Sequence, residues 1–361
     1  MKNFALQLLL IFLLGQLILP AQDYQVLVLG DMHYDGMIFH DLSENPPKFH
    51  YSPAEVKRNL TNTERWLPRM LPVAAAVTKQ APFVIQVGDL TQGDCGSEAL
   101  QTQMLESAWR MLKQHFPDKP VYFTPGNHDY RGPGAKKATR SFIAKTMSQE
   151  SKQQVISPDY VIRHGQDVYI FLDAADGTVH LDFLKAELEK AKNARYKFVI
   201  GHYPFLPITG QSESGVFLGK GKEALWEEMF DLLLKHNVIY LCGHMHRNTV
   251  IEYSSAKGRV SQLMAFSILS PGPNKPDLEI LGPENYSRKL HDRFPRMQKL
   301  LEKLQPDVRE YFYSRNPGGY TVMNISDQGI TADIVFHWNR KPYTTVTLRS
   351  CRAATRVPEK Q

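Results

Sequence analysis

The stretch YQVLVLGDMH, residues 24–33, is a short apolar run that ends at a glycine and is followed by Asp31 and His33. Its Val, Leu and Tyr residues show no helical period, which is typical of a buried strand. Five further runs have the same form: APFVIQVGDL (81–90), KPVYFTPGNHD (119–129), DVYIFLDAAD (167–176), YKFVIGHYP (196–204) and VIYLCGHMH (238–246). The sequence therefore predicts six buried strands, each followed by polar side chains.

Helical patterns lie between these runs, at residues 98–113, 181–192 and 223–236. Strands that alternate with helices indicate a layered α/β domain. In such domains, ligands bind beyond the carboxyl ends of the strands. Because nearly all the metal-capable side chains noted above follow a strand end, we expect a functional site there.

The C-terminal part of the chain has a different pattern. Residues 318–349 contain three β-type runs separated by turn sequences, which predicts an antiparallel meander that completes a sheet. Residues 270–316 begin with a Pro/Gly-rich stretch and continue with a charged helical pattern over 287–311, which predicts a helical insertion on one side of the body. We expect one domain over residues 22–350 and a short tail over 351–361.

The composition excludes some classes of function and leaves others open. The net charge of +6 suits an anionic substrate, although a mildly basic solvated surface gives the same value. The chain has no block of lysine or arginine residues, so a nucleic-acid duplex is not expected as a partner. The three cysteines, Cys95, Cys242 and Cys351, allow at most one disulfide, so the fold does not depend on a disulfide framework.

The N-terminus has the pattern of an export signal. Lys2 precedes a mostly apolar run over residues 4–19, which is short for a membrane span, and Ala21 suits a cleavage site. We expect a signal peptide over residues 1–21, removal of which leaves a secreted or periplasmic protein without a stable membrane span. The alternative is an uncleaved membrane anchor.

Seven polar residues at five strand ends form a candidate metal centre. Each motif is weak by itself, because Asp and His at strand ends often cap turns. Together they supply carboxylates, imidazoles and one amide oxygen, a set that suits zinc, manganese, iron or nickel. Seven ligands are too many for one tetrahedral ion but fit two ions that share a carboxylate, for which Asp89 is the natural choice. The seven are Asp31, His33, Asp89, Asn127, His202, His244 and His246.

The order of these motifs, D-x-H, GD, GNHD, GH and GHxH, resembles the calcineurin-like metallophosphoesterase superfamily over roughly residues 25–250. The resemblance implies a four-layer α/β/β/α sandwich of two mixed β-sheets flanked by helices, with two metal ions at one rim. It implies one ion held by Asp31, His33, Asp89 and His246. It implies a second ion held by Asp89, Asn127, His202 and His244.

The resemblance also implies a reaction, the hydrolysis of phosphate mono- or diesters by a hydroxide that bridges the two ions. His128 would protonate the leaving oxygen or stabilise charge on the phosphoryl group, and Asp129 would orient His128. One position departs from a branch of the superfamily. Purple acid phosphatases carry a tyrosine three residues after the bridging aspartate, where this chain has Gln92, so an iron(III)–tyrosine centre is not expected.

The substrate is less defined by the motifs. We expect a small phosphoester, which includes nucleotides, and we expect the loop 34–55 and the insertion 270–316 to border the cleft. Arg131 and Arg247 follow site motifs and are candidate phosphate-binding residues, although isolated arginines are more often solvated. The alternative function is a catalytically silent metal-binding interaction module of the same fold, which the presence of His128 disfavours.

Overall fold

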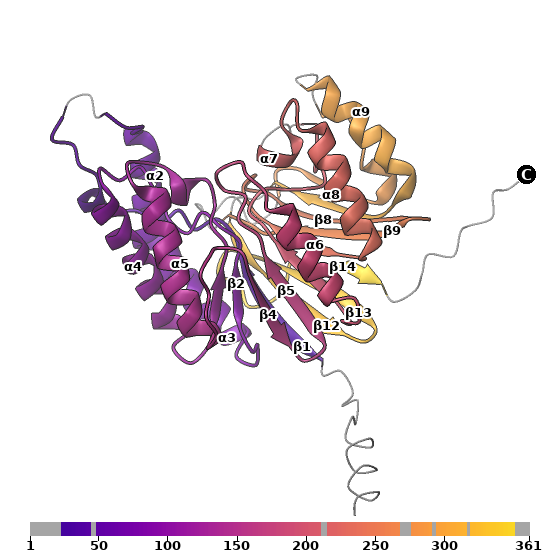
Figure 1. The fold of residues 1–361 in the computed structure, drawn as a ribbon, viewed down its shortest axis with the longest axis horizontal. Coiled ribbons are helices and arrows are strands. Elements are labelled where there is room, and N and C mark those ends of the chain that lie inside the picture. The colour runs from indigo at the N-terminus through magenta and orange to yellow at the C-terminus, as the bar shows by residue number, and fades with distance from the viewer. Residues whose placement is uncertain are drawn as a thin grey trace, which may run out of the picture.

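The computed structural model describes residues 23–44, 48–210, 215–267, 276–290, 294–315 and 318–350. These residues form two mixed β-sheets with helices on their outer sides (Figure 1). The expected α/β sandwich of two mixed sheets flanked by helices is therefore confirmed. The expected signal peptide and the tail lie outside the described residues.

The first sheet has the strand order β14-β13-β12-β1-β2-β3. Its strands are β1 (Tyr24–Leu29), β2 (Val84–Gln86), β3 (Val121–Phe123), β12 (Gly319–Ser326), β13 (Gly329–Phe336) and β14 (Thr344–Ser350). β1, β2 and β3 are parallel, and Leu29 pairs with Gln86, which pairs with Phe123. The three strands therefore end in register, so the loops that follow them start side by side.

The second sheet has the strand order β10-β11-β8-β9-β7-β6-β5-β4. Its strands are β4 (Tyr160–His164), β5 (Asp167–Phe171), β6 (Lys197–Ile200), β7 (Ile239–Cys242), β8 (Asn248–Ser255), β9 (Gly258–Met264), β10 (Glu279–Leu281) and β11 (Val308–Ser314). β5, β6, β7 and β9 are parallel neighbours, and Ile200 pairs with Leu241. The loops after β6 and β7 therefore also start together.

Helices cover the outer face of each sheet (Figure 1). The helices beside the first sheet are α2 (Pro53–Thr61), α3 (Leu67–Val77), α4 (Glu98–His115) and α5 (Ala135–Ser151). Those beside the second sheet are α6 (Leu181–Lys190), α7 (Gly215–Leu218), α8 (Glu223–Lys235) and α9 (Pro295–Leu304). Ser97 is the N-cap of α4, because its hydroxyl accepts a hydrogen bond from the Leu100 amide at 3.3 Å.

Strands of the second sheet are buried on both faces. In β6, Phe198 and Ile200 belong to the apolar cluster shared with the first sheet, whereas Val199 belongs to the cluster beneath α6, α8 and α9. This double burial explains why the strand sequences are continuous apolar runs rather than alternating patterns.

Most predicted elements are present. The six predicted strands are β1, β2, β3, β5, β6 and β7, and the three predicted helices are α4, α6 and α8. Residues 318–349 form the expected antiparallel meander, β12-β13-β14. Cys95 and Cys242 are buried and free, and Cys351 lies outside the described residues.

The prediction of a helical pattern over 287–311 was wrong at its C-terminal end. The helix α9 begins at Pro295 and ends at Leu304, and residues from Val308 onward form β11, which pairs antiparallel with β8. Tyr311 and Tyr313 are buried in the outer apolar cluster. Burial of these aromatic side chains against a sheet outweighs the charged helical pattern that precedes them.

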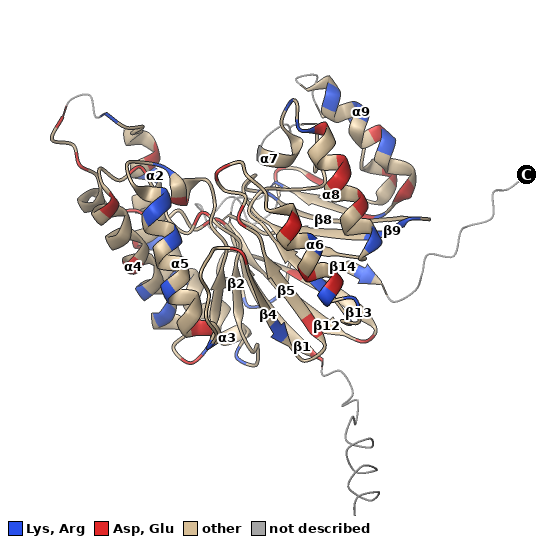
Figure 2. Cartoon of the chain, viewed as in Figure 1, with Lys and Arg blue, Asp and Glu red and all other residues tan. Residues whose placement is uncertain are grey.

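Charged residues are spread over the helices beside both sheets. Basic residues are prominent along α5 and acidic residues along α6 and α8 (Figure 2). The net charge of +6 therefore does not by itself locate a binding site. None of the helices in the described parts of the chain is both long and apolar enough to cross a bilayer.

Candidate metal centre

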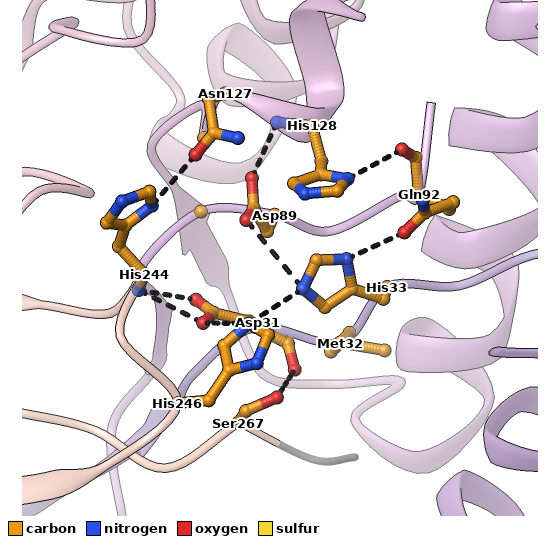
Figure 3. Close-up of polar contacts among 12 residues, drawn as sticks. Asp31, Met32, His33, Asp89, Gln92, Asn127, His128, His244, His246 and Ser267 are labelled. Carbon is orange, nitrogen blue, oxygen red and sulfur yellow. Dashed lines mark hydrogen bonds and ion pairs between the residues drawn. The ribbon is translucent and has the colours of Figure 1, made fainter. Parts of the chain in front are cut away.

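The seven predicted ligand residues lie together where five parallel strands end. Asp31 and His33 follow β1, Asp89 follows β2 and Asn127 follows β3. His202 follows β6, whereas His244 and His246 follow β7. The site therefore lies between the two sheets, with contributions from both. Figure 3 shows six of these side chains around one centre, those of Asp31, His33, Asp89, Asn127, His244 and His246.

Asp31, His33 and His246 form the first group of candidate ligands. Nε2 of His246 lies 3.2 Å from Oδ2 of Asp31 and 3.1 Å from Nε2 of His33. Asp31 and His33 are buried, whereas the His246 side chain is 30% exposed. The site is therefore accessible to solvent at His246.

Asp89, His202 and His244 form the second group, and Asn127 lies among them. Oδ1 of Asn127 lies 3.1 Å from Nε2 of His202 and 2.9 Å from Nδ1 of His244. Oδ2 of Asp89 lies 3.1 Å from the same His202 nitrogen. These distances bring together the four residues that the resemblance assigns to one ion.

Asp89 lies between the two groups. Its Oδ2 atom is 3.1 Å from Nε2 of His202 and 3.7 Å from Nε2 of His33. Its Oδ1 atom accepts a hydrogen bond from the backbone amide of His128 at 2.8 Å. One carboxylate oxygen is thus free to face both groups while the other fixes the carboxylate in place.

The donor chemistry fits bound cations. Nδ1 of His202 lies 3.0 Å from the Val87 carbonyl, an acceptor, so this nitrogen carries a proton. The lone pair of Nε2 then faces Oδ2 of Asp89 and Oδ1 of Asn127, which are also acceptors. Such a cluster needs a positive charge at its centre, either a proton or a metal ion.

The pKa values of Asp31 and His202 also show that positive charge is favoured among these side chains. Burial lowers the pKa of His202, but the Asp89 carboxylate, with Asp31, outweighs burial and raises it to about 9. Burial raises the pKa of Asp31 to about 7, helped by the charge of Asp89 and opposed by His202. Metal binding must therefore displace protons from these groups.

The remaining imidazoles are held neutral. Burial lowers the pKa of His244 to about 3 and that of His246 to about 4, with the charges of neighbouring histidines acting in the same direction. Burial also holds the pKa of His33 well below its ordinary value. Neutral imidazole is the form that binds metals, so these three side chains are ready to act as ligands.

Two glycines of the motifs are required by close packing of the site. A Cβ at Gly126 would lie 2.2 Å from Oδ1 of Asp89. A Cβ at Gly243 would lie 2.3 Å from Oδ1 of Asp31. Both distances are far inside van der Waals contact, so the glycines of GNHD and GHMH let the backbone approach the carboxylates.

Four of the candidate ligands have left-handed backbone conformations. The φ angles are 44° at His33, 51° at Asp89, 75° at His244 and 52° at His246. This region is unfavourable for residues other than glycine, and such strain concentrates at functional sites. The strand ends thus turn sharply in order to aim these side chains at a common centre.

His128 lies beside the candidate ligands and has a defined orientation. Its Nδ1 atom is 3.0 Å from the Gln92 carbonyl, an acceptor, so that nitrogen carries the proton of the neutral ring. Nη1 of Arg131 lies 2.9 Å from each ring nitrogen. Burial lowers the pKa of His128, although the charge of Asp89 opposes the shift.

The expected role of Asp129 as the residue that orients His128 is contradicted. Oδ1 of Asp129 accepts hydrogen bonds from the amide and hydroxyl of Thr91, both at 2.8 Å. Oδ2 accepts from the amides of Gly126 at 2.9 Å and Leu90 at 3.2 Å. Since backbone donors occupy both oxygens, Asp129 ties the turn after β2 to the turn after β3, and the Gln92 carbonyl holds His128 instead.

Arg131 is held at the site by Asp94. Its Nη2 atom lies 2.6 Å from Oδ2 of Asp94, and its Nε atom donates to Oδ1 at 3.2 Å. Glu55, in the predicted rim loop 34–55, lies 3.7 Å from the same guanidinium. Glu55 belongs to α2, so this contact places the first turn of that helix beside Arg131, and a position of the loop at the cleft stays a prediction. Arg247 is half-buried and donates to the carbonyl of His246 at 2.8 Å.

The insertion 270–316 is not placed at the cleft by the described residues. Its described part supplies strands β10 and β11 of the second sheet, and the Tyr286 hydroxyl donates to the Pro207 carbonyl, in the loop after β6, at 2.6 Å. Residues 268–275 and 291–293 lie outside the described residues. A role for this segment at the cleft remains a prediction.

Sequence reasoning missed the polar residues that support the ligands. Asn59, Gln92 and Asp94 are buried. Gln92 contacts His33, Asp94 contacts Arg131 and Asn59 contacts Gln92, whereas the sequence singled out only Gln92, as the replacement of a tyrosine. Their partners lie far away in sequence; Asn59 and Gln92, for example, are 33 residues apart. A polar residue inside a helix such as α2 is indistinguishable from a solvent-exposed one by its spacing.

The geometry agrees with the comparison of the chain with known protein families. The calcineurin-like phosphoesterase family matches residues 24–248, more than half of the chain. The chain belongs to this family. The match begins at β1 and ends just beyond the GHMH motif, so it contains every strand end that contributes to the candidate metal centre.

Several solved structures, phosphatases among them, share the fold. A dimetal phosphatase from Danio rerio is 10% identical, with a TM-score of 0.52 over 91% of this chain and 99% of that chain. The purple acid phosphatase PPD1 of Lupinus luteus is 13% identical, with a TM-score of 0.52 over 91% and 55% of the two chains. GAP50, the anchor in the inner membrane complex of Plasmodium, is 13% identical, with a TM-score of 0.50 over 91% and 89%.

These likenesses establish the fold rather than a substrate. Among curated proteins, none matches the chain. The activity must therefore be argued from the family, the donor set and the residues beside it.

Proposed function

We propose that the chain is a binuclear metal-dependent phosphoesterase that hydrolyses small phosphate mono- or diesters, nucleotides included. The observation that carries this proposal is the position of Asp89, whose Oδ2 atom faces both groups of candidate ligands at 3.1 and 3.7 Å. In this proposal Asp31, His33 and His246 hold one ion, Asn127, His202 and His244 hold the other, and Asp89 is shared. Zinc, manganese, iron and nickel all suit this donor set.

When bound, two such cations neutralise phosphoryl oxygens and lower the pKa of a water molecule, which supplies the nucleophile. The protein positions these groups and excludes solvent, because most of the ligand side chains are buried. We propose that a phosphoester reaches the site beside His246, whose side chain is partly exposed. No iron(III)–tyrosine centre is proposed, because Gln92 stands at the tyrosine position.

His128 is proposed as the residue that acts on the leaving group. With Nδ1 donating to the Gln92 carbonyl, Nε2 is the atom that exchanges a proton with the leaving oxygen or stabilises phosphoryl charge. Arg131 is proposed to bind a phosphate oxygen beside His128, because Asp94 engages its Nε and Nη2 atoms and its Nη1 atom lies 2.9 Å from both ring nitrogens of His128. Arg247 is a second candidate for the same role.

The proposal includes export. It rests on the N-terminal pattern of residues 1–21. N-terminal sequencing of the protein recovered from its source would test it. A mature chain that starts near Gln22 supports export, whereas a chain that retains residues 1–21 contradicts it.

The enzymatic proposal is tested with p-nitrophenyl phosphate and bis-p-nitrophenyl phosphate, each with manganese, zinc, iron or nickel. We expect turnover of at least one ester, dependent on added metal and lost with a chelator. Absence of hydrolysis of both esters and of nucleotides with every metal would overturn it.

A second candidate function is a metal-binding interaction module without catalysis. The likeness to GAP50, described as an anchor, favours it. The complete donor set together with His128 favours the enzyme. A His128→Ala variant distinguishes them, since an enzyme loses rate and keeps its metals, whereas a module has no rate to lose.

A further inference from the structure

Gln92 is a buried amide that joins two parts of the site. Its side chain is 1% exposed, and its Oε1 atom lies 3.0 Å from Nδ1 of His33. The same oxygen accepts a hydrogen bond from Nδ2 of Asn59, in α2, at 2.7 Å. Asn59 is fully buried. These contacts link α2, through Gln92, to a residue of the first candidate ligand group. Figure 3 shows the contact between Gln92 and His33.

The hydrogen bond from Asn59 determines which end of the Gln92 amide faces His33. Because Asn59 supplies an N–H donor, the oxygen and not the NH₂ group of Gln92 must face both partners. His33 can then approach that oxygen only with a proton on Nδ1. Its Nε2 atom then carries no proton, and the lone pair of this nitrogen faces the centre of the site. Nε2 of His33 lies 3.1 Å from Nε2 of His246.

We propose that Asn59 and Gln92 are positioning residues that hold His33 in the Nδ1-protonated tautomer and thereby set the cation affinity of the first ligand group. This inference rests on the proposed function, since it takes His33 as a metal ligand. Residues that orient metal ligands in this way typically change metal affinity by about 10–100-fold.

The helix that carries Asn59 is adapted to this task. α2 continues into a π-helical turn at Asn62–Trp66, and such turns are frequent at functional sites. Asn62 donates to the Met32 carbonyl at 2.6 Å, and the Thr63 hydroxyl accepts from the Asp35 amide at 3.0 Å. These two bonds hold the backbone on either side of His33, whose φ angle of 44° is strained.

The hydrogen bonds that link Asn59, Gln92 and His33 reach only one of the two ligand groups. The imidazole of His202, in the second group, is oriented by the Val87 carbonyl at 3.0 Å and does not depend on a side chain. Loss of the Gln92 amide should therefore weaken one bound cation and spare the other. A general loss of folding would weaken both, so the two effects are separable.

The test compares the wild-type protein with Gln92→Leu, which removes the acceptor at similar size. Cobalt(II) is titrated into metal-free protein, and two dissociation constants are obtained from absorbance and calorimetry. The tautomer of His33 is read in metal-free, histidine-¹⁵N-labelled protein by long-range ¹H–¹⁵N correlation. We expect one affinity to fall about 10–100-fold, the other to stay unchanged, and the Nδ1-protonated form of His33 to lose its dominance.

Two variants serve as controls. Gln92→Glu keeps an oxygen acceptor for both donors and should restore the tautomer and most of the affinity. Gln101→Leu removes another buried glutamine, whose amide donates to Thr91 and to the Asp129 carbonyl but not to a candidate ligand. It should lower the melting temperature without changing either cobalt affinity.

The outcomes separate this inference from the proposed function. If wild-type protein binds two cations and Gln92→Leu binds both equally well, or if Gln101→Leu has the same effect as Gln92→Leu, the positioning role is overturned. If wild-type protein binds no cation, the proposed metal centre itself is overturned, and the inference falls with it.

Discussion

Oδ2 of Asp89 lies 3.1 Å from Nε2 of His202, and this buried contact places the carboxylate where two groups of ligands meet. The Asp89 pKa reflects the position: burial favours protonation, but the charges of His202 and His128 outweigh it and hold the pKa well below the usual carboxyl range. Asp89 therefore stays ionised and is available to two cations at once.

Asp89→Asn should weaken both cations together. The amide has one oxygen and no negative charge, and even residues that merely orient ligands change affinity about 10–100-fold, so we expect a loss of more than about 100-fold at each site. Elemental analysis and cobalt(II) titration measure the effect. Asp35→Asn, at a buried carboxylate that bonds His40 instead, is the control and should retain both cations. Loss of a single cation in Asp89→Asn would show that the carboxylate is not shared.

His128→Ala should lower the rate of phosphoester hydrolysis while metal content is unchanged. General acid catalysis contributes about 10²–10⁴ to rates, and the loss should be larger for esters with poor leaving groups, which need a proton most. His180→Ala, at a half-exposed histidine paired with Asp159, is the matched control and should have wild-type activity. An unchanged rate in His128→Ala would exclude this residue as the acid.

The ligands could be predicted from the sequence, whereas their supports could not. Asp31, Asp89 and His202 each follow a short apolar run, and a run followed by a metal-capable side chain is a local pattern. The role of Asp129 was predicted wrongly because its partners are backbone amides, which have no signature in a sequence. Asn59 escaped notice for a related reason, since its side chain bonds a residue of another loop.

The fold shows the same division. Strands β1, β2 and β6 were predicted because burial on both faces makes them continuous apolar runs. The pairing of β11 with β8 was not predicted, because residues 308–314 follow a helix and include charged residues. That two sheets oppose each other came from the family resemblance and not from the runs themselves, since strand order is a property of contacts distant in sequence.

Asp129→Asn tests the corrected role of Asp129. Its carboxylate accepts from three backbone amides and one hydroxyl, and an asparagine would direct an NH₂ group at donors. We expect the free energy of unfolding to fall by about 2–4 kcal/mol, because the buried donors lose an acceptor oxygen. Urea denaturation of the metal-free protein measures this loss. A variant with wild-type stability and an altered pH profile of activity would instead support the role in orienting His128.

Gly126→Ala should reduce cation affinity as well as stability. The added Cβ would lie 2.2 Å from Oδ1 of Asp89, so the carboxylate or the turn after β3 must move. Small-to-large changes in packed regions typically cost about 1–3 kcal/mol. Gly177→Ala is the control: its Cβ would meet nothing within 4 Å, and only the positive φ of 84° opposes it. Equal metal affinity in Gly126→Ala and wild-type protein would contradict the close packing at Asp89.

His40→Gln should remove a stabilising interaction that is present in acid and absent in base. Nε2 of His40 lies 2.8 Å from Oδ1 of Asp35, and Nδ1 lies 2.9 Å from the Asp94 carbonyl. Burial lowers the pKa of His40, but the hydrogen bond and charge of Asp35 outweigh it and raise the pKa above 6.5. The stabilisation is therefore complete below about pH 6.5 and is lost as the pH rises through the folded-state pKa.

Urea denaturation of metal-free protein over about pH 5.5–9 measures the difference in unfolding free energy between wild-type and His40→Gln. The difference should be largest at the acidic end and shrink toward the basic end. His115→Gln is the control of opposite sign, because burial lowers the pKa of His115 and its neutral form is the one that folds best. A His40→Gln difference that does not vary with pH would show that His40 is not charged in its pair with Asp35.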